Sequence, residues 1–431
     1  MESWYIDDKK KYQLHIEIKT WNVEANDLYD YKTKKFREVL DESGENNYYV
    51  RKRNNIITKK DNQSDINFEN EEIIFRTRKS LKNDNEYEII NPTKKNMKRT
   101  QENINNLDNN AWLVIGSNSE CCQNENEQYL LNENDIIKLG LKKYEIIEKN
   151  IKISNDDNIE EDYYNISQMN KQKGSIFDIN IEKCQYKITE NKVKNDEKME
   201  ESENKESDDN KERCFICFDD DSTVENPLLH LCKCKNWIHY QCLKHYMNTK
   251  IEIHENSKCT VKTYVSRKFN CDVCLTPYPL RFKIKEYNKI YKLIDYNIAP
   301  ELNHIVLESL DYIKNNSNLK IVHVIQLIDE TISIGRLFAN DILDTNSTVS
   351  RNHAIIKYNK DNGNLTIEDR NSTFGTLVLI KGNIKMKEKK ISFQVGKSLV
   401  TAGLIEIKET NDEHSTNDIS NNIISDKKIQ N

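Results

Sequence analysis

Seven cysteines and one histidine in the middle of the chain form an ordered string with the spacing C-x2-C, C-x-C, H-x2-C, C-x2-C. Zinc takes four thiolate or imidazole ligands in a tetrahedron, and two ligands one or two residues apart can reach the same ion from a tight turn. Four such pairs predict two zinc ions. No carboxylate takes part and no coordination position stays open for water, so both ions should be structural. The eight expected ligands are Cys214, Cys217, Cys232, Cys234, His239, Cys242, Cys271 and Cys274.

Two other uses are open to cysteines in general, namely burial in an apolar core and pairing in disulfides. Four correctly spaced pairs are much more specific than a lone C-x2-C, which disfavours the core interpretation. The N-terminal stretch MESWYIDDKKK lacks the apolar segment of a secretory signal, so nothing indicates an oxidising compartment. Eight reduced ligands favour the cytoplasm or the nucleus.

The length of 431 residues allows two or three domains. Charged residues make up 32% of the chain and the net charge is -6, so no strongly basic surface points to a nucleic-acid partner. No stretch approaches the roughly twenty apolar residues of a spanning helix, and we expect a soluble protein with no membrane partner.

Changes in residue pattern divide the chain into seven segments. Short apolar runs with turn residues between them begin at Ala111 and predict strands, whereas the acidic stretch at 190–212 has almost no aromatic or branched side chains and predicts a flexible linker. The expected segments are a poorly assigned, β-rich and partly disordered N-terminal region (1–110), a β-rich segment (111–150), an acidic linker (151–212), the cysteine-rich module (213–282), a connector (283–301), a β-sandwich (302–408) and a disordered tail (409–431).

The ligand order C4-H-C3, with a single residue between Cys232 and Cys234, resembles the RING-CH (RING-variant) zinc finger, whose members are typically E3 ubiquitin ligases. The resemblance implies a small α+β cross-brace. The first zinc would be held by Cys214, Cys217, His239 and Cys242, and the second by Cys232, Cys234, Cys271 and Cys274. A helix is expected from Leu243 to Ile251, with Leu243, Tyr246 and Met247 on its core face.

The same resemblance implies a groove for a ubiquitin-conjugating enzyme (E2). Ile216 inside the first ligand pair, Tyr246 and Pro277 stand at the positions that form this groove in such ligases. Leu275 departs from the family, because many active ligases have a basic residue there that contacts ubiquitin.

Two ligand spacings also depart from the RING-CH pattern. Only four residues separate Cys234 from His239, and 28 residues separate Cys242 from Cys271. Metal binding tolerates both departures, but they put ligase competence in question. A PHD-like reader has the same ligand order and remains a minor alternative, against which the C-x-C pair argues.

Many short strands separated by polar turns follow residue 302 and predict an all-β sandwich. Gly335-Arg336, then Ser350-x-x-His353, then Asp369-x-x-Ser372 with Gly375-Thr376 resemble the landmarks of a forkhead-associated (FHA) domain, a phosphothreonine-binding module. Segment 111–150 also resembles the end of such a sandwich. It is either a degenerate FHA-like fragment or a set of unrelated strands.

The FHA resemblance implies a phosphopeptide site. Arg336, Ser350 and Thr373 would contact the phosphate, since a guanidinium and two hydroxyl groups suit its charge and its acceptor oxygens. Arg351 would touch the peptide backbone and His353 would brace the loop. Phe374 departs from the family, which usually has an asparagine there that grips the ligand backbone.

Two functions follow for this multidomain chain. In the first, it is a RING-type E3 ligase that recruits an E2 carrying ubiquitin through its zinc finger and a threonine-phosphorylated partner through its FHA domain. No residue of the chain would form a covalent intermediate, so there are no catalytic residues in the strict sense. In the second, the two modules form a non-catalytic, zinc-stabilised scaffold that binds phosphoproteins.

Overall fold

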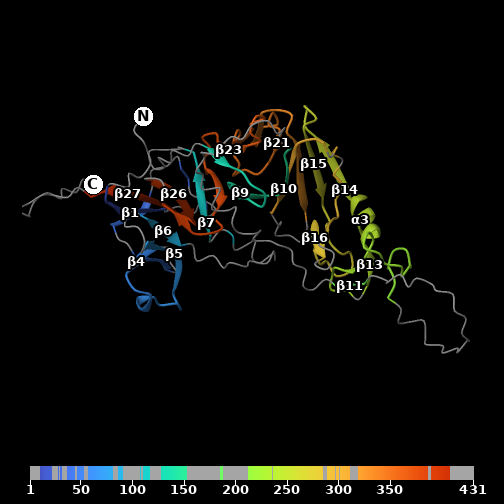
Figure 1. Cartoon of the computed structure of the whole chain (residues 1–431), viewed down its shortest axis with the longest axis horizontal. Helices are drawn as coiled ribbons and strands as arrows, with labels where there is room; N and C mark the ends of the chain where they lie inside the picture. The colour runs from blue at the N-terminus through green and yellow to red at the C-terminus, as the bar shows by residue number, and fades with distance from the viewer. Residues whose placement is uncertain are drawn as a thin grey trace, which may run out of the picture.

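The computed structural model places three β-rich units in a row along the longest axis of the molecule (Figure 1). The structure describes residues 10–21, 28, 30–31, 36–43, 46–52, 57–80, 86–90, 107, 110–116, 128–152, 185–187, 212–234, 236–284, 289–296, 298–299, 301–310, 319–386 and 390–407. Most of the expected acidic linker and all of the expected tail at 409–431 lie outside these residues. Within the described part of the chain, no helix has the length and apolar character that a membrane crossing requires.

A 12-stranded sheet runs through all three units in the strand order β14-β15-β19-β18-β10-β9-β24-β7-β26-β27-β1-β2. Its middle part forms a sandwich with the five-stranded sheet β21-β20-β22-β23-β8. This central sandwich contains β7 (Ala111–Ile115), β8 (Gln128–Leu130), β9 (Ile136–Leu139), β10 (Lys142–Asn150), β18 (His304–Ser309), β19 (Lys320–Gln326), β20 (Thr331–Gly335), β21 (Ile342–Leu343), β22 (Ala354–Tyr358), β23 (Leu365–Asp369) and β24 (Thr376–Leu379).

The strands expected at 111–150 are present, but they do not form a separate fragment. β8 pairs with β23, β9 and β7 flank β24, and β10 pairs with β18, so this segment closes both sheets of the central sandwich. Its apolar side chains are buried in the same core as those of β20 and β22. The sandwich expected at 302–408 therefore takes four of its strands from a segment that precedes it by about 150 residues in the sequence.

The end of the expected sandwich segment also belongs elsewhere. β26 (Lys390–Val395) pairs with β7 of the central sandwich on one side and with β27 (Ser398–Glu406) on the other. β27 pairs with β1 (Tyr12–Trp21), which pairs with β2 (Phe36–Ser43). These strands pack on a sheet of β25, β6, β5, β3 and β4, where Phe75 meets Phe393 edge to face at 5.3 Å. The facing sheet has the bounds β3 (Tyr48–Lys52), β4 (Ile57–Lys60), β5 (Glu71–Lys79), β6 (Tyr87–Ile90) and β25 (Ile384–Lys385), with a 3-10 turn at Gln63–Asp65.

The cysteine module (residues 212–294) lies between β10 and β18 in the sequence. It contains β12 (Leu228–His230), β13 (Ile238–His239), α3 (Tyr240–Asn248), β14 (Ile251–Glu255), β15 (Val261–Ser266), β16 (Arg281–Ile284) and β17 (Lys289–Lys292). β11 (Gln185–Lys187), within the expected linker, pairs with β12. The expected connector at 283–301 is in part a strand of this module, because β17 pairs with β16 and buries Tyr291.

The long interval between Cys242 and Cys271 forms a hairpin, β14–β15, that joins the 12-stranded sheet. β15 pairs with β19 from Val261↔Ile325 to Ser266↔Lys320. The module also shares a core with the central sandwich, in which Leu243 and Phe269 lie with Val306 and Val322. The cysteine module is thus fused to the central sandwich by main-chain hydrogen bonds and by a common core.

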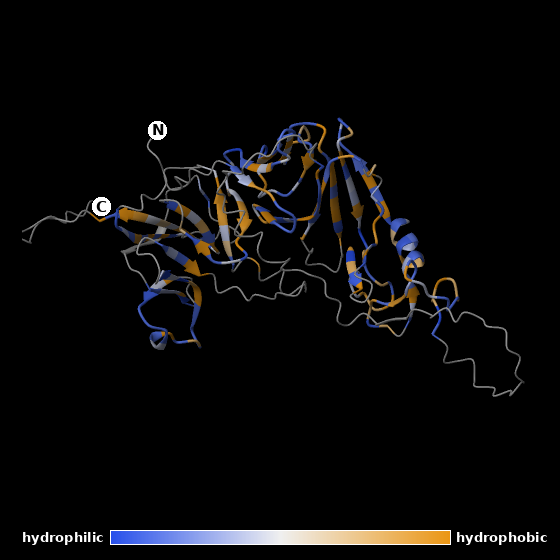
Figure 2. Cartoon of the chain, viewed as in Figure 1, coloured by the Kyte–Doolittle hydropathy of each residue, from blue (hydrophilic) through white to orange (hydrophobic). Residues whose placement is uncertain are grey.

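Helix α3 begins and ends earlier than the sequence pattern indicated. It covers Tyr240–Asn248 instead of 243–251, because Ile251 starts the β14 strand. Leu243 and Met247 are buried as expected, whereas Tyr246 is 37% exposed and does not belong to the core face. Figure 2 shows hydrophobic residues on many of the strands and hydrophilic residues along much of α3.

Candidate functional site

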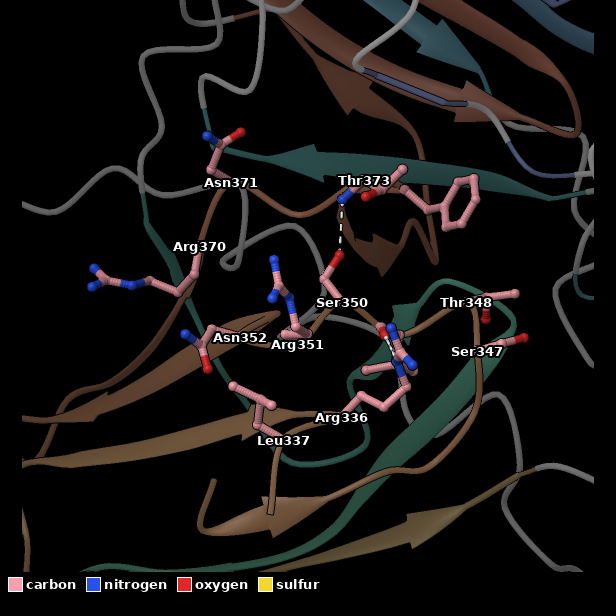
Figure 3. Close-up of a pocket in the computed structure, with 12 residues that line it drawn as sticks. Arg336, Leu337, Ser347, Thr348, Ser350, Arg351, Asn352, Arg370, Asn371 and Thr373 are labelled. Carbon is pink, nitrogen blue, oxygen red and sulfur yellow. Dashed lines mark hydrogen bonds between the residues drawn. The ribbon is translucent and has the colours of Figure 1, made fainter. Parts of the chain in front are cut away.

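A cavity of about 450 Å³ opens where the loops that follow β20, β21 and β23 meet. Figure 3 shows its lining side chains. Arg336, Ser350, Arg351 and Thr373, the four residues expected to contact a phosphopeptide, all line it. They come from three loops at one end of the sandwich, so the fold gathers residues that are up to 37 positions apart.

Arg336 directly follows β20, and its loop is fixed tightly against the neighbouring one. Its backbone N–H donates to Ser350 O at 3.0 Å, and its Nε–H donates to Val349 O at 3.3 Å. Gly335 is required here by close approach, since a Cβ at this position would lie 2.3 Å from Arg351 O. The position just before Arg336 therefore has room for glycine and for no residue with a Cβ.

Ser350 links two of the loops through its side chain and its backbone. Its Oγ accepts a hydrogen bond from Thr373 N at 3.0 Å, drawn as a dashed line in Figure 3. Its N–H donates to His353 Nδ1 at 3.0 Å, which leaves the His353 Nε2–H to donate to Gly375 O at 3.1 Å. Burial lowers the pKa of His353, in keeping with a neutral ring that accepts at one nitrogen and donates at the other. His353 thus braces the site from within.

Asp369 holds the third loop. Its Oδ1 accepts hydrogen bonds from the hydroxyls of Ser372 at 2.6 Å and Thr376 at 2.7 Å, and its Oδ2 accepts from Ser372 N at 2.9 Å. All three side chains are buried. The Asp-x-x-Ser and Gly-Thr landmarks consequently serve to shape the loop that presents Thr373, and do not themselves line the cavity.

Residues far away in the sequence complete the site, and no sequence signal identified them. Leu141 N donates to Thr348 Oγ1 at 2.9 Å, so segment 111–150 supports a cavity-lining residue. Tyr31 N donates to Thr373 O at 3.1 Å, and the Tyr31 ring lies where a Cβ on Gly375 would be 2.7 Å away. Gly375 has a φ of +73°, a conformation that favours glycine.

The charge of the cavity wall suits an anion. Among the residues that the structure describes, those that line the cavity include three arginines and no carboxylate, although the chain as a whole has a net charge of -6. In Figure 3 the guanidinium groups of Arg336, Arg351 and Arg370 point in separate directions around the cavity. Phe374 and Leu337 supply apolar surface beside them. A phosphate would find here a guanidinium, hydroxyl groups and backbone N–H donors.

Comparison with protein families identifies this part of the chain. Residues 332–396 match the family model of the FHA domain, described as "FHA domain". The chain contains an FHA domain. The match begins in β20 and includes the three loops of the cavity, whereas strands β7–β10, which complete the FHA sandwich, lie outside the matched residues. A search of curated proteins found no match to the chain.

A second candidate site lies in the cysteine module. The structure gathers Cys214, Cys217, His239 and Cys242 in one group, and Cys232, Cys234, Cys271 and Cys274 in another, with the ligand atoms of each group all within 4.8 Å of one another. These are the two sets that the cross-brace resemblance implies. All seven cysteines of the two groups are free of disulfides. The two groups could each hold a zinc ion.

The orientation of His239 fits a metal ligand. Its Nδ1 faces Cys217 Sγ at 3.2 Å, while its Nε2 lies 2.7 Å from Asp221 O and donates to it. A carbonyl acceptor on the outer ring nitrogen fixes the ring so that the inner nitrogen can face a metal. Cys214 Sγ accepts N–H bonds from Ile216 and His239, as a thiolate ligand would.

The acidities of the thiols also fit a divalent cation. Burial opposes ionisation of Cys214, but N–H bonds to its sulfur lower its pKa to about 7. Burial likewise opposes ionisation of Cys274, whereas the hydroxyl and the N–H of Thr276 lower its pKa to about 5. Burial and the neighbouring Cys217 raise the pKa of Cys242 to about 12. Crowded thiols of this kind resist joint ionisation until a cation compensates their charge.

The three residues expected to contact an E2 are all at the surface. Ile216 is 40% exposed, Tyr246 is 37% exposed and Pro277 is exposed. Tyr246 OH donates to Asp272, and Lys250 Nζ lies 4.1 Å above the Tyr246 ring. Tyr246 is therefore held in place by charged neighbours.

Each C-x2-C turn is followed by a large apolar residue in a left-handed conformation. Phe218 has a φ of 63° and is 74% exposed, and Leu275 has a φ of 57° and is 61% exposed. Such a conformation costs a bulky residue about 1–2 kcal/mol, and glycine would avoid the cost. Both turns thus present an apolar side chain to solvent at the expense of local strain.

Proposed function

We propose that the chain binds threonine-phosphorylated proteins through the cavity of its FHA domain. The observation that carries this proposal is the meeting of Arg336, Ser350 and Thr373 at one cavity, whose described lining residues include no carboxylate. A phosphothreonine brings nearly two negative charges and three acceptor oxygens, which the Arg336 guanidinium and the two hydroxyls would satisfy. Arg351 would reach the backbone of the bound peptide.

The loops around this cavity are already hydrogen-bonded to one another without a ligand. His353 and Asp369 fix them from beneath, so little ordering remains to oppose binding. Phe374, which stands where the family usually has an asparagine, lines the cavity and would replace a backbone grip by an apolar contact. We therefore expect a preference for peptides with an apolar residue near the phosphothreonine.

Fluorescence anisotropy tests this function. The probe is a degenerate peptide library with a fixed central phosphothreonine, titrated with the full chain. We expect Arg336→Ala to weaken binding about 30-fold, since a charged hydrogen bond contributes roughly 2 kcal/mol. Lys360→Ala, in the exposed turn after β22, is the matched control and should bind like the wild type. Equal affinity for the library with unmodified threonine would refute the function.

A second function is proposed for the cysteine module, namely that of a RING-type E3 ubiquitin ligase. Exposed apolar side chains on both ligand turns favour it, because Phe215 and Ile216 on one turn and Val273 on the other offer a surface for an E2. Two structural zinc ions would fix the two turns relative to each other when bound. The residues would act by positioning the thioester of the E2, with no covalent intermediate on this chain.

The alternative is a scaffold in which zinc serves folding alone. Leu275 and the short interval between Cys234 and His239 favour the scaffold hypothesis. A PHD-like binding module is a minor alternative within this hypothesis. Autoubiquitination by the full chain with a panel of E2 enzymes distinguishes them. A ligase should lose activity in Ile216→Ala while its zinc content stays unchanged, and a zinc-loaded protein that is inactive with every E2 would support the scaffold. The need for reduced thiols favours the cytoplasm or the nucleus in either case.

A further inference from the structure

The hairpin of the cysteine module reaches the loop that carries Arg336. This module hairpin consists of β14, β15 and the turn at 256–260, and the arginine loop consists of residues 336–341. Asn256 Nδ2 donates to Asp341 Oδ1 at 3.3 Å, and Lys258 Nζ lies 3.1 Å from the same oxygen. Asp341 closes the arginine loop just before β21. A residue between two zinc ligand pairs therefore contacts the phosphate-binding part of the FHA domain.

Asp341 transmits this contact into the strand that ends at Gly335. Its Oδ2 accepts hydrogen bonds from Ser333 N at 2.9 Å and Ser333 Oγ at 2.8 Å. Only 8% of the Asp341 side chain is exposed, so its part-buried hydrogen bonds to Ser333 contribute more than surface bonds would. The Lys258 side chain is 53% exposed, so its ion pair with Asp341 is the weaker of these contacts. The carboxylate thus connects the module hairpin to β20, from which Arg336 projects.

The other end of the arginine loop is fixed to the cavity wall. Leu337 N donates to Arg351 O at 3.1 Å, and Asn340 Nδ2 donates to Leu337 O and to Arg351 O. The loop is consequently held on one side by the FHA domain and on the other by the module hairpin. The hairpin itself is anchored, because β15 pairs with β19 and Gln326 N donates to Thr260 O at 2.8 Å.

We propose that the module hairpin positions the arginine loop, so that Asn256 and Lys258 are positioning residues for phosphopeptide binding. This inference rests on the proposed phosphothreonine function. It makes the cysteine module a part of the FHA binding site in addition to any role toward an E2. It also gives a physical reason for the long interval between Cys242 and Cys271.

The test uses Asn256→Asp, which keeps the Oδ1 acceptor of the hairpin turn and replaces the Nδ2 donor by an oxygen facing the Asp341 carboxylate. We expect the full-length variant to bind the phosphothreonine library roughly five-fold to ten-fold more weakly. Asn362→Asp is the matched control, with the same change of charge in the exposed turn between β22 and β23, and it should stay within about two-fold of the wild type.

A second pair of variants separates positioning from general destabilisation. Lys258→Ala should weaken binding, whereas Lys258→Arg keeps a cation beside Asp341 and should restore it, with thermal midpoints equal to that of the wild type. Wild-type affinity in both Asn256→Asp and Lys258→Ala would overturn the positioning role. Absence of any binding by the wild type would instead overturn the proposed function, and this inference with it.

Discussion

The FHA cavity and the two Cys/His clusters of the cysteine module are organised by different means. In the FHA domain, Asp369, His353 and Ser350 connect the loops by protein hydrogen bonds, and the site is complete before a ligand arrives. In the cysteine module, eight ligand atoms are crowded within 4.8 Å in two groups whose thiols resist joint ionisation. The first site is preorganised by the fold, whereas the second has thiols whose charge a bound cation would compensate.

The two sites also differ in their dependence on distant sequence. The zinc ligands come from one stretch of 61 residues, Cys214 to Cys274. The FHA sandwich needs strands from both 111–150 and 304–379. Integrity of the FHA site should therefore be sensitive to remote deletions, and integrity of the zinc sites to single local substitutions.

The largest expected effect comes from removing the early segment. A fragment with residues 302–408 alone, or with 205–431, lacks β7–β10 and uncovers the core at β24 and β23. Each buried apolar side chain that the fragment lacks contributes roughly 1.5–3 kcal/mol to the free energy of unfolding. The loss of four such side chains therefore equals the net stability of a typical domain. We expect no cooperative unfolding transition by circular dichroism. Addition of residues 107–152 as a separate peptide should restore it, and a cooperatively folded 302–408 fragment would contradict the topology.

Loss of one zinc ligand should have the next largest effect. Cys274→Ser removes a thiolate from the second cluster, and a structural zinc site contributes about 10 kcal/mol or more to the folding of its module. Zinc content measured by atomic emission should fall from two equivalents to one, while the FHA core remains folded. Cys259→Ser changes an exposed thiol on the module hairpin and is the control, with two equivalents expected. Full zinc content in Cys274→Ser would disprove its assignment as a ligand.

A methyl group at Gly335 should damage the FHA site and spare the zinc clusters. The new Cβ would lie 2.3 Å from Arg351 O, so the backbone must move at a cost of about 1–3 kcal/mol. We expect Gly335→Ala to weaken phosphothreonine binding at least ten-fold in anisotropy titrations. Zinc content should stay at two equivalents. Unchanged affinity would mean that the loop tolerates displacement, contrary to a preorganised site.

A fall in pH should weaken the contact between the module hairpin and β19 of the central sandwich. Burial lowers the pKa of His323 from 6.5 to about 4, and its Nδ1 lies 2.9 Å from Thr263 Oγ1 on the module hairpin. The folded state favours the neutral ring, so this contribution to stability is complete above pH 6.5 and is lost as the pH falls towards 4. The loss amounts to about 3 kcal/mol. Denaturant titrations of wild type and His323→Gln between pH 7 and pH 4 should show a shallower pH dependence in the variant, and parallel curves would exclude the effect.

The smallest expected effect is a gain in the stability of the cysteine module. Leu275→Gly relieves the left-handed backbone after the second C-x2-C turn and should stabilise the module by about 1 kcal/mol in thermal unfolding. If the exposed leucine serves E2 docking, the same variant should lose ubiquitin transfer. Asn371→Gly, which relieves a similar φ of 55° in the FHA domain, is the control and should leave transfer unchanged. Loss of stability in Leu275→Gly would show that the side chain contributes more by packing than its backbone costs.

Local spacing predicted both binding sites, and non-local pairing could not be predicted. The ligand pairs around Cys214 and Cys271 are each closed by a turn of a few residues, so their pattern is visible in the sequence. Gly335 and Asp369 are the last residues of strands that the hydrophobic pattern marked, and Ser350 lies in the loop that precedes β22. The pairing of β8 with β23 spans more than 230 residues and leaves no local signature.

The same reason explains the errors of detail. The residue pattern at 111–150 predicts strands but not their partners. The sequence therefore left two hypotheses for this segment, a degenerate FHA-like fragment or unrelated strands. The sequence predicts a helix at 243–251 but no strands in the rest of the interval between Cys242 and Cys271, because the pairing of β15 with β19 is non-local. Tyr246 was expected in the core because helical spacing fixes the face of a helix but not which edge of that face meets the protein.

The antiparallel register of β10 and β18 has a practical meaning for protein engineering. Asn150 lies opposite His304, so the chain leaves the FHA domain and returns to it at almost the same point. The entire excursion through the cysteine module could be excised and the two strand ends joined by a tight β-turn. The result would be a miniature phosphopeptide receptor without metal, and its affinity would report how far the receptor was shaped by the part that had been cut away.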